Sequence, residues 1–246
     1  MLESSKPGRR LPSIRELALT AVTVALAAIA LVTAWSAPRG SELWFWTVAC
    51  FAGELLWVRL PLGRATLSMA SAGNFAALLL LPRGQAMVAA AGASFVSEAV
   101  VMRKPLVRLL FNAGQTVLSV GAASLAFHQL APAGPPAHAI LGNGMLPLAA
   151  AGAAYALVNT GLVSVAVGLT EHVAPWRAWW TNFGSIYELL SSSALFSLGG
   201  LFAVIFSIAG PAGTLFLVLP LLLAHDSYRR YLAREDAAKE TVRQAA

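Results

Sequence analysis

Apolar residues fill most of this chain in long blocks, and short polar or Gly- and Pro-rich connections separate them. Eight blocks follow one another, at residues 16–36, 43–62, 66–82, 85–102, 105–131, 145–170, 183–208 and 211–228. A helix of about 20 apolar residues spans the hydrocarbon core of a bilayer. The pattern predicts an all-α, polytopic integral membrane helical bundle with seven or eight transmembrane helices. Seven remains an alternative because the third and fourth blocks are short and rich in Ala, Gly and Ser.

Composition agrees with a membrane bundle. The chain of 246 residues is 58% hydrophobic and only 11% charged, and its mean hydropathy is +0.70. Soluble domains carry about 25% charged residues. The single cysteine, Cys50, excludes an internal disulfide and a multi-cysteine metal site. We therefore expect the lipid bilayer, and no nucleic acid, as a partner.

The distribution of basic residues predicts the orientation in the membrane. Of 17 Lys and Arg residues, only Arg39 and Arg83 fall in connections that would lie outside if the N-terminus is inside. The positive-inside rule therefore places both termini in the cytoplasm, in a bacterial cytoplasmic (inner) membrane. We divide the chain into a basic N-terminus (1–15), a transmembrane domain (16–228) and a cytoplasmic helical tail (229–246). Residues 175–183, rich in Trp, predict a short interfacial segment.

A polar seam crosses the apolar block at 105–131. Its members are Arg108, Asn112, Gln115 and Ser119, spaced by four, three and four residues, so they share one helix face. Polar groups at membrane depth must meet protein or water. The other segments are therefore expected to wrap around this face.

Further polar residues lie inside the other apolar blocks. They are Glu54, Asn74, Glu98, Asn159 and Glu188. A carboxylate at such a depth needs a partner, and Arg108 is the expected partner of Glu98 or Glu188. Two hypotheses stay open for these candidates: they bridge the helices as structural hydrogen bonds, or they line a pocket that binds a small ligand or relays a proton.

Sequence motifs of catalysis are missing from the chain. It holds no His-Glu-x-x-His pair, no Gly-x-Ser-x-Gly elbow and no phosphate-binding loop. We expect no catalytic residues, no metal and no cofactor. His138, in the Pro-rich connection at 132–144, is expected to be a solvated loop residue.

The last apolar block continues into a charged stretch without Gly or Pro. Strong helix formers, and Glu235 and Lys239 at a spacing of four, predict a helix there. Two interpretations stay open for it: a solvated helix end at the lipid head groups, or an output helix that projects into the cytoplasm.

Several stretches resemble a known bacterial module. The run Gly63–Ala93, the segment Lys104–Ser119 with its Leu-Phe-Asn-Ala-Gly-Gln, and the tail motif Ser227-Tyr-Arg-Arg-Tyr-Leu carry the resemblance. It is similar to the multi-span membrane sensor region that precedes HD-GYP and GGDEF signalling domains, over residues 15–235. Neither signature is present in the sequence, so no cyclic-dinucleotide chemistry is implied. A second similarity is to the substrate-binding membrane subunits of energy-coupling-factor transporters, which usually have six spans. Neither resemblance implies residue roles.

These observations together predict a non-enzymatic sensory or ligand-binding module. A small-molecule ligand or a membrane state would bias helix packing, and the last helix would pass the signal to a cytoplasmic signalling protein. The alternative is a membrane subunit that binds a vitamin-type solute for a transporter ATPase. A third class is a purely structural assembly partner.

Overall fold

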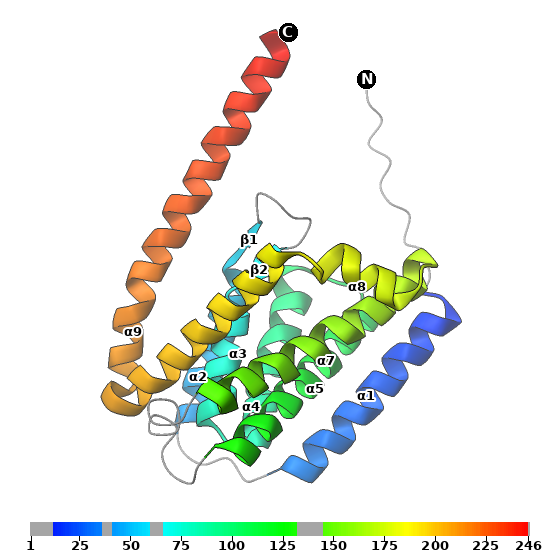
Figure 1. The fold of residues 1–246 in the computed structure, drawn as a ribbon, viewed down its shortest axis with the longest axis vertical. Helices are drawn as coiled ribbons and strands as arrows, with labels where there is room; N and C mark the ends of the chain where they lie inside the picture. The colour runs from blue at the N-terminus through cyan, green and yellow to red at the C-terminus, as the bar shows by residue number, and fades with distance from the viewer. Residues whose placement is uncertain (1–11, 36–40, 60–65, 132–144, 246) are drawn as a thin grey trace.

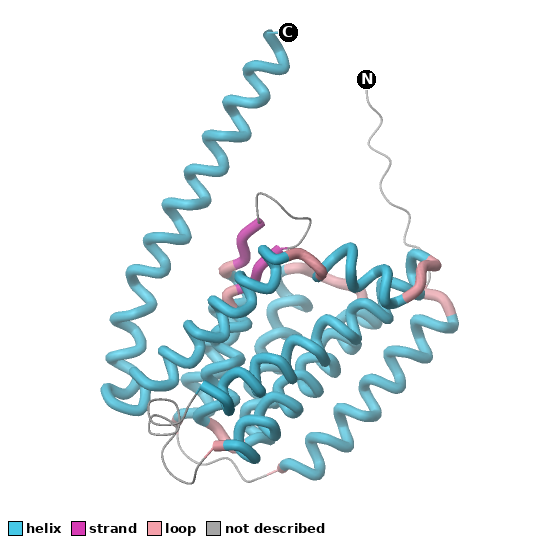
Figure 2. Tube along the Cα trace, in the orientation of Figure 1, coloured by secondary structure: helices cyan, strands magenta, loops and turns pink. Residues whose placement is uncertain are grey.

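The computed structural model describes residues 12–35, 41–59, 66–131 and 145–245. The helices are α1 (Ile14–Ala34), α2 (Glu42–Leu55), α3 (Ala70–Leu80), α4 (Arg83–Val96), the π-helix η1 (Ser97–Val101), α5 (Leu106–Leu130), α7 (Met145–Glu171), α8 (Pro175–Phe183) and α9 (Ile186–Ala245). Figures 1 and 2 show a helical bundle with one small hairpin. The expected all-α class is confirmed. Most of the basic N-terminus and the connection that holds His138 lie outside the described residues.

The second and third predicted spans differ from the structure. Helix α2 ends at Leu55, and α3 has only 11 residues. Between them, β1 (Trp57–Arg59) pairs antiparallel with β2 (Thr66–Ser68). Aromatic and β-branched residues at 57, 58 and 66 favour strands over helix. The apolar blocks 43–62 and 66–82 are therefore each part helix and part hairpin.

The helices run back and forth across the bundle (Figure 1). The start of α1, the hairpin, α8 and the C-terminal end of α9 lie on one side, as the predicted alternation of sides requires. Five described helices are long and apolar enough to cross a membrane: α1, α4 with η1, α5, α7 and α9 up to Pro220. The chain is thus a multi-pass membrane protein, and its exact number of spans stays a prediction.

Helix α5 lies at the centre of the bundle and contacts α1, α3, α4 and α7. Other segments therefore surround much of α5, although Arg108 at the start of the polar face is exposed. Small residues let neighbouring helices approach closely, as membrane helix packing requires. A Cβ atom at Gly53 of α2 would lie 2.8 Å from the Cα of Ala70, and one at Gly199 of α9 would lie 2.7 Å from Phe75 Cβ. Helix α3 is therefore held tightly between α2 and the first half of α9.

Helix α9 consists of two helical halves that meet at Gly210. The Gly210 backbone has φ 62° and ψ −160°, a conformation that interrupts the helix. The first half descends through the bundle, the chain turns back, and the second half returns and continues to Ala245 (Figure 1). No break separates the second half from the tail, so the predicted boundary at residue 228 lies inside a continuous helix.

Candidate functional site

A buried carboxylate, Glu98 of η1, is the centre of a polar network. Lys104 Nζ lies 2.5 Å from Glu98 Oε1, and Asn112 Nδ2 donates to both carboxylate oxygens, at 2.7 and 2.8 Å. Glu98 is only 6% exposed, so these partners replace the water that it has lost. The network ties η1 and the loop after it to α5.

Local backbone structure brings Lys104 to this carboxylate. After the π-turn, Arg103 adopts a positive φ of 52°, which turns the chain back. The Lys104 N–H then donates to the Glu98 carbonyl oxygen at 3.1 Å. Glu98 is therefore paired with Lys104, and the expected pairing with Arg108 is wrong. Arg108 is exposed, because it lies on the side of α5 that the bundle does not cover.

A second carboxylate, Glu54 of α2, extends this network. It is close enough to Glu98 and Lys104 to interact with both charges, and its side chain is hydrogen-bonded to Ser94 of α4. Two acidic residues and one lysine thus lie near one another in the structure.

The rest of the seam forms a separate contact. Gln115 Nε2 donates to Asn159 Oδ1 at 2.5 Å and to the Asn159 carbonyl oxygen at 3.1 Å, joining α5 to α7. The Ser119 hydroxyl donates to the Gln115 carbonyl oxygen within its own helix. Asn112, Gln115 and Ser119 therefore do not line one common pocket: the two amides bridge helices and the serine satisfies its own helix backbone.

The two remaining candidates lie elsewhere. Asn74 of α3 donates from Nδ2 to the Tyr155 hydroxyl at 3.4 Å, while its buried Oδ1 has no partner among the described residues. Glu188 is half-buried in the first turn of α9, where its backbone N–H donates to Ser185 Oγ. The structure records no contact that joins Glu188 to the carboxylate network.

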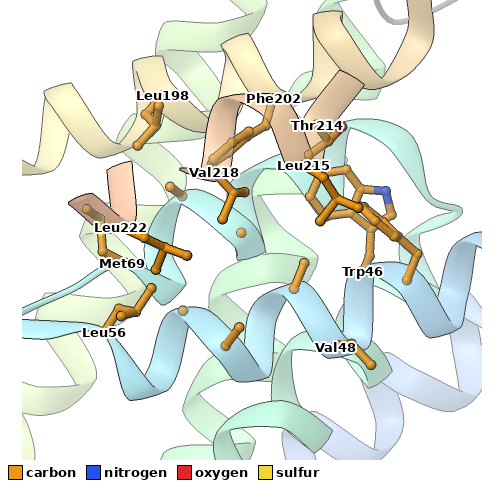
Figure 3. Close-up of a pocket in the computed structure, with 16 residues that line it drawn as sticks. Trp46, Val48, Leu56, Met69, Leu198, Phe202, Thr214, Leu215, Val218 and Leu222 are labelled. Atoms are coloured by element: carbon orange, nitrogen blue, oxygen red, sulfur yellow. The ribbon is translucent and has the colours of Figure 1, made fainter. Parts of the chain in front are cut away.

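An apolar cavity of about 200 Å³ lies outside this polar interior, between α2, α3 and both halves of α9 (Figure 3). Its walls come from these four segments and from the residues that flank α2 and α3: Phe45, Trp46, Val48, Ala49, Ala52, Gly53, Leu56, Met69, Ala72, Gly73, Leu198, Phe202, Thr214, Leu215, Val218 and Leu222. The one hydroxyl among them, on Thr214, donates to the Gly210 carbonyl oxygen at 3.3 Å. The lining suits an uncharged apolar group and offers no groups for acid–base chemistry. Within the described residues, no cluster of His, Cys, Asp or Glu could hold a metal ion.

Lys104, Tyr155 and this cavity are not among the features that the sequence predicts. Lys104 stands six positions after Glu98, outside the helical spacings of three and four that indicate a shared face. The Gly210-Pro211 pair inside an apolar stretch was a signal for the turn of α9. Nothing in the sequence indicates that the chain then returns along α2 and α3, because a cavity built from distant segments leaves no local pattern.

Comparison with known proteins gives one result. No curated protein and no solved structure matches the chain. Among protein families, MASE9 matches residues 18–225, a range that contains all of the cavity wall and at least part of each described helix. The match covers most of the sequence and agrees with the sensor-like character of its motifs. The chain belongs to the MASE9 family of membrane-associated sensor domains.

Proposed function

We propose that this protein is a non-enzymatic sensor module that passes a signal through α9 to a cytoplasmic partner. Membership of a membrane-associated sensor family supports the sensory part of the proposal. The output part rests on one observation. The helix that lines the apolar cavity with Thr214, Leu215, Val218 and Leu222 is the same helix that leaves the bundle and runs to Ala245.

Helix α9 connects the cavity, where the stimulus would bind, to the tail that would carry the output. The first half of α9 is fixed against α3 at Gly199, and the second half follows it after the turn at Gly210. An apolar molecule in the cavity would contact both halves. A ligand shifts a conformational equilibrium only when it binds one state better than the other. The second half of α9 is the wall that can differ between such states, because it lies across the cavity from the tightly packed α2–α3 pair.

The chemistry of the cavity limits the stimulus. Its apolar walls favour an uncharged hydrophobic molecule or the hydrocarbon part of a membrane lipid. The polar network around Glu98 serves a different purpose in this proposal: it holds η1, α5 and α2 together, so that motion is confined to α9. A proton relay through Glu98 is thus not part of the proposed mechanism.

Hydrogen–deuterium exchange in lipid nanodiscs tests this proposal. Ala49→Phe places a ring in the cavity from α2, and we expect it to change amide exchange in residues 211–224 of α9. The matched control is Ala153→Phe, which makes the same change on an exposed position of α7. If Ala49→Phe alters exchange only in α2 and α3, the cavity is not coupled to α9. Solute uptake by vesicles that hold protein lacking residues 229–246 would instead support a transport function.

A further inference from the structure

The apolar cavity is an elongated slot. Trp46 and Thr214 line one end of it, and Leu56, Met69 and Leu222 line the other end (Figure 3). Along α9, the wall from Thr214 to Leu222 extends about 12 Å, because each helical residue adds about 1.5 Å. The slot therefore runs along a helix that crosses the membrane, in roughly the direction in which lipid chains run.

One long side of the slot is open, between α2 and the second half of α9. Val48 and Ala52 of α2 line this opening together with Leu215 and Leu222 of α9, and all four residues are exposed. The close packing of α2 against α3 covers the opposite side. Exposed apolar side chains of a multi-pass membrane protein face the hydrocarbon of the bilayer. The opening is therefore continuous with the surface that faces lipid.

The two ends of the slot differ in how well they are covered. Trp46 is 1% exposed and packs against Phe45 and Phe206, with ring centroids 5.3 Å apart in both contacts. At the other end, Leu222 is 38% exposed and Leu56 directly precedes the β-hairpin. The slot is thus closed at the aromatic cluster and more open towards the side on which the hairpin and the C-terminal end of α9 lie (Figure 1).

The size and chemistry of the slot suit one part of a larger apolar molecule. Sites that enclose a drug-sized molecule typically measure about 300 to 1,000 Å³, whereas the slot measures about 200 Å³. None of the described residues that line it is charged, and the Thr214 hydroxyl already donates to the Gly210 carbonyl oxygen. The slot therefore offers no group that would hold a polar head group, which must stay outside.

We propose that the slot binds one hydrocarbon chain of a membrane lipid, which enters sideways between α2 and the second half of α9. The lipid belongs to the leaflet next to the hairpin. Its head group stays at that surface of the bilayer, and the methyl end of its chain lies against Trp46. This proposal rests on the sensor function proposed above, because it names the molecule whose binding α9 would report.

Photo-labelling of the full chain in lipid nanodiscs tests the site. The probe is phosphatidylcholine with a diazirine near the methyl end of one acyl chain, diluted into ordinary phosphatidylcholine, and tandem mass spectrometry locates the labelled residues. Phe202 and Thr214 line the slot and are only 8% and 2% exposed, whereas Phe216 is 78% exposed and lies outside it. We expect labels on all three residues. Labels on Phe216 without any on Phe202 or Thr214 would overturn the proposal.

Two variants control for lipid that reaches these residues by another route. Ala49→Phe fills the slot and should remove the labels from Phe202 and Thr214 while it leaves the label on Phe216. Ala153→Phe, at an exposed position of α7, should leave all three labels in place. Labels on Phe202 and Thr214 that persist in the Ala49→Phe protein would contradict binding in the slot.

A second probe tests the direction of the chain. It carries the diazirine near the ester end of the same acyl chain, and we expect its labels at Met69 and Leu198, towards the open end of the slot. Labels from this probe at Thr214, with labels from the first probe at Met69, would show a chain that enters from the opposite leaflet. That result would overturn the proposed arrangement.

Hydrogen–deuterium exchange separates this proposal from the sensor function. If lipid labels the slot and Ala49→Phe leaves exchange in residues 211–224 unchanged, the lipid site is supported and its coupling to α9 is refuted. If Ala49→Phe changes that exchange although no lipid probe labels Phe202 or Thr214, the coupling is supported and the lipid proposal is overturned.

Discussion

Replacement of Gly210 by alanine tests how the structure builds the turn of α9. The φ and ψ angles at this residue, 62° and −160°, belong to a region that only glycine occupies readily. An added Cβ atom would have no atom within 4 Å. The penalty of Gly210→Ala therefore comes from the backbone conformation and not from a clash with a neighbouring helix.

The size of this penalty follows from backbone energetics. A non-glycine residue in such a conformation costs about 1 to 3 kcal/mol. Alanine also restricts the unfolded chain, which returns about 0.4 to 1 kcal/mol. We expect a net loss of about 1 to 2 kcal/mol in the free energy of unfolding. If the turn relaxes in the Gly210→Ala protein, the second half of α9 would also shift away from the cavity.

The assay is reversible unfolding in mixed micelles, by titration with SDS. Gly161→Ala in α7 is the matched control, because its Cβ also has no atom within 4 Å and its backbone is helical. There alanine should stabilise the protein by about 0.5 to 1 kcal/mol. The two substitutions should thus change the unfolding free energy with opposite signs. A stabilising effect of Gly210→Ala would refute the argument that glycine is required at the turn.

Three further predictions concern the interior of the bundle. Lys104→Met should lower the free energy of unfolding by about 1 to 3 kcal/mol, because it leaves the buried Glu98 carboxylate without its cation. The loss stays within this range because the Lys104 side chain is 33% exposed and water screens its charge. The control Arg108→Met, at an exposed position, should change the free energy of unfolding little. A double-mutant cycle with Gln115→Leu and Asn159→Leu should give a coupling energy of about 0.6 to 2 kcal/mol, and additive effects would contradict the hydrogen bonds between α5 and α7. Gly53→Ala should cost about 1 to 3 kcal/mol through contact with the α3 backbone, and an unchanged melting temperature would contradict that close packing.

The sequence predicts the class of fold well, because membrane helices are recognised from local composition. Long apolar blocks, basic connections and the position of the seam on α5 all follow from residues close to each other in the chain. The hairpin at 57–68 was missed because Trp, Val and Leu serve equally well in a membrane helix and in a strand. Helix α3 has only 11 residues and is shorter than the apolar block 66–82, so apolar composition alone does not determine where the helix begins and ends.

The candidate site was predicted only in part, for a related reason. Helical spacing identified Asn112 and Gln115 as polar residues on a buried face, and the structure joins them to Glu98 and Asn159. The polar seam also predicted Arg108 as the cation that pairs with Glu98. The irregular turn at Arg103 brings Lys104 to Glu98 instead. Periodicity describes regular helices, so it says nothing about residues positioned by a π-turn and a positive φ.

Electron–electron distance measurement tests the central claim, that α9 joins the cavity to the tail. Spin labels at Arg177→Cys on α8 and Ser227→Cys on α9, in a Cys50→Ala background, report the position of the tail relative to the bundle. Labelled protein diluted with unlabelled protein gives distances within one chain. We predict that Ala49→Phe shifts this distance distribution and that Ala153→Phe leaves it unchanged. An unchanged distance distribution in the Ala49→Phe protein would contradict the claim that α9 couples the cavity to the tail.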